Sequence, residues 1–256
     1  MDRGTWIGFL LGVALLAVAI GLGPNPRIFL HGPALIVVLG GLIASTLIRF
    51  PLKQVASAFR IASRAFFKHP ATAQALVLQL VGLSQRARRE GLKALEQHLP
   101  EDAFLAQGLQ MAIDRVPVDR IRDTLVAELH STQDRHSQGQ EIFRFIATAA
   151  PSFGMVGTLI GMVQLFASMK EPSGLASAMA LSLLSTLWGA VIAYLFAIPI
   201  AGKLEVRSRE EAQARQLMVE GILGIASEQN PGQMEEHLNA FLAPTQKVRR
   251  PGAFRE

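Results

Sequence analysis

Apolar residues are concentrated in two long blocks of the chain, and charged residues lie almost entirely outside these blocks. Arg27 is the only charged residue within 4–48, and Lys170 and Glu171 are the only ones within 146–202. About 20 apolar residues in a helix span the hydrocarbon core of a bilayer, so each block is long enough to cross a membrane twice. The pattern therefore predicts a membrane protein built from helices.

Each apolar block is interrupted once by a stretch that breaks helices. Gly-Pro-Asn-Pro at 23–26 divides the first block, and residues 170–174 divide the second. We therefore predict an all-α fold with four transmembrane helices in two hairpins. The predicted regions are a hairpin at 1–50, a cytoplasmic helical domain at 51–145, a hairpin at 146–202, and a cytoplasmic C-terminal helix and tail at 203–256. A signal peptide at 1–22 is the alternative for the first span, but no small-x-small cleavage motif precedes a polar stretch.

The distribution of basic residues predicts the orientation in the membrane. Residues 51–145 contain thirteen Lys and Arg and residues 203–256 contain eight, whereas the two hairpin turns contain one each, Arg27 and Lys170. Loops rich in Lys and Arg stay in the cytoplasm. We therefore expect an inner-membrane protein that crosses the membrane several times, with both termini in the cytoplasm.

The charged regions are predicted to be helical as well. Apolar residues recur at roughly helical spacing over 71–99, interrupted only at Gly82 and Gly91, and Pro100 ends the run. A second, shorter helix is expected over 102–113. Pro117 stands where a first-turn proline is tolerated and opens a run that continues into the third span. The fourth span extends to Ile225 without a helix breaker.

Composition narrows the class of protein further. The chain is 50% hydrophobic and only 18% charged, with a mean hydropathy of +0.31, which disfavours a disordered chain and an ordinary globular enzyme. The pI of about 10.1 is explained by the cytoplasmic excess of Lys and Arg, so we predict no nucleic-acid binding. The absence of cysteine excludes disulfides and thiolate sites.

Small and hydroxyl residues mark one face of the second hairpin. Gly154, Gly157 and Gly161 lie at i, i+3 and i+7 of the third span and let another backbone approach closely, so we predict that they pack against a helix. Thr158 follows the middle glycine of the third span. In the fourth span, Ser182, Ser185 and Thr186 place hydroxyls at i, i+3 and i+4, so both helices of this hairpin carry hydroxyls. These hydroxyls line a polar path or, alternatively, only bond carbonyls of their own helices.

Acidic residues are absent from the interior of the predicted spans. A path for protons or sodium normally needs an ionisable carboxylate at membrane depth, so a conducting chain would take that group from a partner. The sequence contains no zinc-protease, nucleophile-elbow or phosphate-loop motif. All six histidines lie outside the spans or at their margins, so we expect no enzyme activity, no catalytic residue, no metal and no cofactor.

Six segments of the chain, in order, resemble the A subunit of the flagellar motor stator, the MotA/PomA family within the MotA/TolQ/ExbB superfamily. They are Gly8–Gly21, Gly32–Gly41, Ala87–Glu96, Ala150–Val163, Met179–Ala190 and Gly221–Pro231. The resemblance implies a channel for H⁺ or Na⁺ that drives rotation of the flagellar rotor. It also implies a homopentamer around two B subunits (MotB or PomB type), each with one membrane helix that carries an aspartate.

The resemblance also assigns roles to individual residues. Thr158 and Thr186 match hydroxyls near the ion path, and Ser185 stands where sodium-driven members commonly have threonine. Pro151 and Pro199 match prolines linked to motion, and each removes a helix hydrogen bond, as a hinge would require.

In the cytoplasmic domain, Arg88 and Glu96 match charged residues that contact the rotor protein FliG, with Arg89 and Glu90 beside them. On charge pattern alone, this group would be interpreted as a solvated helix face. Trp188 replaces a tyrosine that is usual in the family.

Three other functions are alternatives for a helical membrane protein of this kind. An ExbB/TolQ-like channel subunit would have three spans and no N-terminal hairpin like that of residues 1–50. A membrane-embedded hydrolase would need a nucleophile and a base within the spans, and no histidine lies in the third or fourth span. A structural scaffold would conduct no ions. Whether the ion is H⁺ or Na⁺ is left open, because a second hydroxyl suits sodium without excluding protons.

Overall fold

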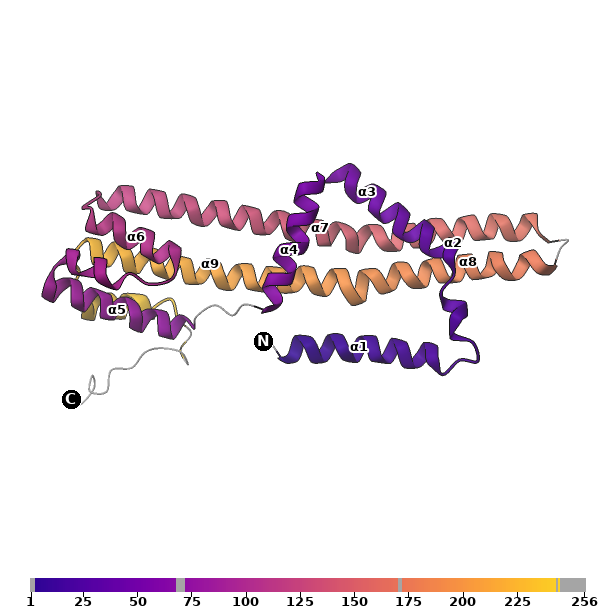
Figure 1. Cartoon of the computed structure of the whole chain (residues 1–256), viewed down its shortest axis with the longest axis horizontal. Helices are drawn as coiled ribbons and strands as arrows, with labels where there is room; N and C mark the ends of the chain where they lie inside the picture. The colour runs from indigo at the N-terminus through magenta and orange to yellow at the C-terminus, as the bar shows by residue number, and fades with distance from the viewer. Residues whose placement is uncertain (1–2, 68–71, 170–171, 243, 245–256) are drawn as a thin grey trace. The chain divides into compact units, whose positions relative to one another are not determined.

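The computed structural model describes residues 3–67, 72–169, 172–242 and 244, and in these residues the regular structure is helical, with no strands (Figure 1). The N-terminal helices are α1 (Arg3–Gly21), a 3₁₀ turn (Pro26–Phe29), α2 (Gly32–Leu35), a π-helical stretch (Ile36–Gly40) and α3 (Gly41–Arg49). The predicted break at residues 23–26 is therefore present. The backbone N–H of Arg27 donates to Asn25 Oδ1, which caps the 3₁₀ turn.

The longest helices continue between the charged regions and the second apolar block. α7 (Val118–Ala167) continues from the charged region into the third apolar run, as predicted. α8 (Pro172–Ala190), a π-helical stretch (Val191–Ala197) and α9 (Ile198–Ala226) follow one another without a break, which agrees with the predicted extension of the fourth span. Lys170 and Glu171, in the turn of the second predicted hairpin, lie outside the described residues.

The remaining helices are shorter. They are α4 (Leu52–Phe67), α5 (Ala73–Glu90), a 3₁₀ helix (Leu92–His98), α6 (Ala103–Ile113) and α10 (Pro231–Asn239). Of the two glycines predicted to interrupt the run at 71–99, α5 continues through Gly82 and ends before Gly91, whose φ is +87°. Glycine adopts this backbone conformation at little cost and commonly ends a helix.

The chain divides into two compact units. Unit 1 comprises residues 1–68 and 136–206, and unit 2 comprises residues 69–135 and 207–256. Residues of the two charged regions that were predicted separately thus belong to one unit. Unit 2 has a continuous hydrophobic core in which α5, α6, the start of α7, the end of α9 and α10 all bury side chains, including Leu80, Leu109, Leu125, Ile222 and Leu238.

The helices that can cross a membrane lie wholly or partly in unit 1. Three helical stretches are long and apolar enough, Pro26–Arg49, Val118–Ala167 and Gly174–Ala226, whereas Trp6–Gly21 is a shorter apolar helix. Unit 1 has only small buried clusters, and many large apolar side chains along its helices are exposed. An outward apolar surface of this kind suits a lipid environment.

Candidate functional site

The three glycines of the third span lie against α8. A Cβ on Gly154 would lie 3.0 Å from the carbonyl oxygen of Ser185, and a Cβ on Gly161 would lie 2.7 Å from that of Ala178. A Cβ on Gly157 would collide with the Ser185 side chain. α7 and α8 therefore approach at backbone distance along this face, which larger residues would prevent.

Gly189 takes part in this packing, and Gly41 of α3 makes a similar close contact with α7; neither was singled out from the sequence. A Cβ on Gly189 would lie 2.6 Å from the carbonyl oxygen of Ala150 and 3.2 Å from Gly154 Cα. A Cβ on Gly41 would collide with the ring of Phe153. Gly189 lies four and seven residues after Ser185 and Ser182, so its helical register was a usable signal.

Hydroxyl groups of α7 and α8 bond to one another across the same contact. The Oγ1 atoms of Thr158 and Thr186 lie 2.5 Å apart. Thr158 Oγ1 also lies 3.1 Å from the carbonyl oxygens of Gly154 and Ser182, and Ser182 Oγ donates to the carbonyl of Thr158 at 3.1 Å. The hydroxyls thus bond carbonyls of both helices, not only their own. Thr186 is exposed and Thr158 is half-buried, so the pair lies at an accessible edge.

Ser185 occupies a different position from the two threonines. Its side chain is completely buried, and its Oγ donates to the carbonyl of Leu181 at 2.5 Å. It packs against Gly157 inside the helix contact. Within this chain, Ser185 therefore contributes to helix packing, whereas Thr158 and Thr186 present hydroxyls at the surface.

The two prolines lie within continuous helical structure. α7 runs through Pro151 from Val118 to Ala167. Pro199 lies at the start of α9, directly after the π-helical stretch Val191–Ala197. Each proline lacks a backbone N–H and leaves one helix carbonyl without its usual donor, and π-helical stretches are a known way to accommodate such a loss.

No acidic side chain lies within residues 4–48, and the one acid within 146–202 is Glu171, outside the described residues. Among the residues that the structure describes, no group of three or more His, Cys, Asp or Glu side chains is placed to hold a metal ion. The hydroxyl edge is therefore polar but has no ionisable group of its own.

The charged residues predicted to contact a rotor lie at one end of α5. Arg88, Arg89 and Glu90 form its last turn, and Glu96 lies in the following 3₁₀ helix, where the adjacent Leu95 is fully buried. All four are exposed, and none forms an ion pair with another described residue. These charges are thus available to a partner.

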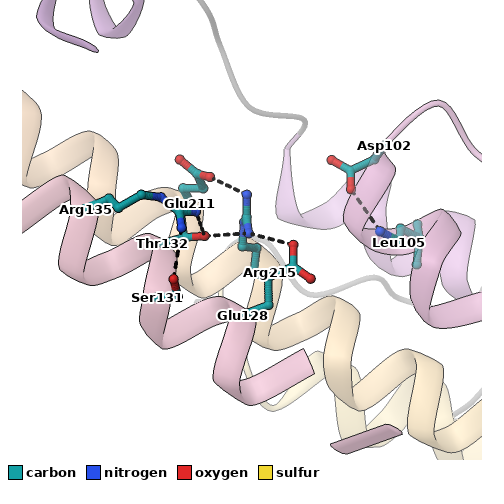
Figure 2. A network of polar contacts seen from close by, with 8 residues as sticks. All are labelled: Asp102, Leu105, Glu128, Ser131, Thr132, Arg135, Glu211 and Arg215. Atoms are coloured by element: carbon teal, nitrogen blue, oxygen red, sulfur yellow. Dashed lines mark hydrogen bonds and ion pairs between the residues drawn. The ribbon is translucent and has the colours of Figure 1, made fainter. Parts of the chain in front are cut away.

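A polar network in unit 2 was not anticipated from the sequence (Figure 2). Arg215 on α9 pairs with Glu211 at 2.9 Å and lies 3.9 Å from Glu128 on α7. It also donates to Thr132 Oγ1 at 3.1 Å and lies over the ring of Phe104 on α6 at 5.0 Å. Arg215 thus connects three helices of unit 2, so this part of α9 is held by specific contacts.

Comparison with known proteins adds to this geometry. Residues 96–217 match the model of the MotA/TolQ/ExbB proton channel family. The chemotaxis protein PomA of Vibrio alginolyticus is 33% identical over 242 residues, which cover 94% of this chain and 96% of PomA. The uncharacterized protein YtxD of Bacillus subtilis is 34% identical over 255 residues, which cover 98% of this chain and 94% of YtxD. The flagellar MotAB stator complex of Bacillus subtilis superposes with a TM-score of 0.85 at 31% identity, covering 95% of this chain and 97% of that one.

Proposed function

The chain belongs to the MotA/TolQ/ExbB proton channel family, and from this premise we infer that it is a stator subunit of a bacterial flagellar motor. It forms a cation channel together with a B subunit, and ion flow through that channel drives rotation of the flagellar rotor. It is a channel subunit and not an enzyme. The observation that carries this function is the near full-length likeness to a flagellar stator structure, which includes residues of the N-terminal hairpin region.

A partner completes the ion path in this proposal. The hydroxyl edge formed by Thr158 and Thr186 contains no carboxylate, so the B subunit supplies an aspartate from its single membrane helix. The cation is H⁺ or Na⁺, passing between that carboxylate and the threonine hydroxyls. Ser185 contributes to this path by holding α8 close to Gly157, and no cofactor takes part.

The proposed assembly is a pentamer of this chain around a dimer of the B subunit. Four spans cross the inner membrane, α1 being the first and the three long apolar stretches the others, and both termini lie in the cytoplasm. Positive charge supports this orientation, because the regions rich in Lys and Arg would face the cytoplasm. Pro151 and Pro199 serve as hinges that let α7 and α8–α9 respond to ion passage.

The cytoplasmic end of α5 contacts the rotor protein FliG in this proposal. Arg88 and Glu96 make the principal contacts and Arg89 and Glu90 lie beside them. Their exposure and lack of ion pairs within the described chain support this role. Charged rim contacts favour fast encounter and release, as a stepping motor requires.

The test is expression of the chain in a flagellated strain that lacks its own stators. We expect swimming only when a B subunit is expressed with it, and no swimming when the B-subunit aspartate is replaced by asparagine. Swimming speed against sodium concentration and against an uncoupler then identifies the ion. Motility without the B subunit, or cation flux that supports outer-membrane transport but not rotation, would contradict the stator function and favour the ExbB/TolQ-like alternative.

A further inference from the structure

α4 presents three chemically different surfaces around its axis. Ala58 and Ala62 are buried, with exposed fractions of 1% and 6%. Leu52 and Phe59 lie two helical turns apart and are 69% and 53% exposed. The third surface is a neighbouring strip that carries the basic residues Lys53 and Arg60.

The basic strip of α4 has no partner within the described chain. Lys53 and Arg60 are seven residues apart, share one face and are exposed. Neither forms an ion pair with another described residue, and α4 contains no Asp or Glu. Nearby glutamates are already occupied, since Glu141 pairs with Arg49 and Glu205 pairs with Arg144, each at 2.6 Å.

The packing of α4 places it where the apolar spans end. Its buried face contacts Ile142 and Phe143 of α7 and Ala201 and Leu204 of α9. The apolar run of 146–202 ends between these same residues, because Arg144 and Lys203 are the first charges on its cytoplasmic side. α4 follows Arg49, the last residue of α3, and crosses both helices at this level (Figure 1).

We propose that α4 is an interfacial helix that binds anionic phospholipid headgroups of the cytoplasmic leaflet through Lys53 and Arg60. Leu52 and the exposed side of Phe59, whose ring also packs edge-on against Phe143 of α7 with centroids 5.2 Å apart, enter the boundary between headgroups and acyl chains. An amphipathic helix with a basic face and exposed Leu and Phe, lying at the end of a membrane span, has the composition that this environment selects. The inference uses the proposed orientation only to assign the leaflet.

Native mass spectrometry of the detergent-solubilised complex with its B subunit tests this proposal. The complex is titrated with phosphatidylglycerol and, separately, with phosphatidylcholine of the same acyl chains. We expect preferential binding of phosphatidylglycerol, and a loss of about fivefold in that preference for each charge removed in Lys53→Gln and Arg60→Gln. The charge-conserving pair Lys53→Arg and Arg60→Lys should retain the preference.

The matched control removes two exposed basic residues of unit 2, Lys93→Gln with Arg122→Gln, and should leave the preference unchanged. Equal binding of the two lipids, an unchanged preference in the α4 double variant, or an equal loss in the control would overturn the proposal. So would a failure of the α4 variant to assemble in lipid-free detergent, since the strip would then contact a neighbouring chain. A wild-type complex that binds phosphatidylglycerol selectively but conducts no cations would contradict the proposed function alone.

Discussion

Thr158 and Thr186 contribute the polar atoms that a cation can reach at the edge of the α7–α8 pair. Their hydroxyl oxygens lie 2.5 Å apart, and Thr186 is exposed. Replacing Thr186 with alanine removes one of these oxygens, whereas replacing it with serine keeps it. The serine variant loses only the methyl group, whereas the alanine variant loses both the methyl group and the hydroxyl, so the difference between the two variants isolates the hydroxyl.

We predict that Thr186→Ala lowers motility with normal assembly. The loss of one net hydrogen bond corresponds to roughly a two- to tenfold change in a rate or equilibrium constant, so the effect should be largest when the ion gradient is limiting. Swimming speed is measured as an uncoupler or low sodium reduces the gradient, and co-purification with the B subunit reports assembly. Thr186→Ser is the control. Unchanged torque at limiting gradient would exclude a position on the ion path.

Residue roles could be predicted only in part from the sequence. Glycine spacing identified the packing face of α7, because one periodicity places Gly154, Gly157 and Gly161 on one side. Ser185 and Thr186 are adjacent, and helical rotation by about 100° per residue separates them. Which of them faces the partner helix depends on where α7 packs, and that contact is set by tertiary structure.

Among the helices, α7 and α8 can lie in backbone contact because glycines, which have no side chain, occupy the contact face. We predict that Gly161→Ala destabilises the chain by roughly 1–3 kcal/mol, because the new Cβ would meet backbone atoms of Ala178 and Ser182 that cannot rotate away. The measurement is the fraction of detergent-solubilised protein that stays monodisperse on size exclusion after heating.

Gly139 is the matched control on the same helix, since nothing lies within 4 Å of a Cβ placed there. Gly139→Ala should stabilise the chain by about 0.4–1 kcal/mol through the lower entropy of the unfolded state. Equal thermal stability of the two variants would show that α7 and α8 are not in backbone contact at Gly161.

The end of α5 should act on rotation and not on folding. We predict that Arg88→Glu leaves the stator complex assembled but impairs rotation, because the side chain is exposed and its charge has no partner in the described chain. Tethered-cell rotation measures the defect, and co-purification with the B subunit measures assembly. Arg122→Glu, also exposed in unit 2, is the control. Normal swimming by the Arg88 variant would remove this residue from the rotor contact.

The sequence predicted long helices better than it predicted where individual helices end. Long runs such as α7 were predicted well, because apolar spacing and the absence of breakers persist over many turns. The sequence marked both Gly82 and Gly91 as interruptions, but a glycine is also compatible with a continuing helix, and only Gly91, with a φ of +87°, ends α5. The Arg215 network was not predicted, because the side chains that bond to Arg215 include residues of another helix that are distant in the sequence.

At the scale of the whole molecule, the chain provides helices and hydroxyls but no membrane-depth acid, so its conducting surface must face the helix that carries one. Met155 lies three residues before Thr158 on α7 and is 61% exposed, whereas Leu15 on α1 is 68% exposed and far from any described hydroxyl pair in sequence. The two side chains are similarly exposed, but Met155 shares α7 with Thr158, whereas Leu15 belongs to a different helix from both threonines of the hydroxyl edge.

We therefore predict that Met155→Cys forms a disulfide with a cysteine placed beside the aspartate of the B-subunit helix, and that Leu15→Cys does not. The chain contains no cysteine, so any cross-linked product comes from the introduced residue. A disulfide requires Cβ atoms about 3.5–4.5 Å apart, which makes the reaction a strict test of proximity. Oxidation in isolated membranes followed by a non-reducing gel gives the yield for each variant. An equal or greater yield at Leu15 would place the partner helix against α1 and separate the hydroxyl edge from the ion path.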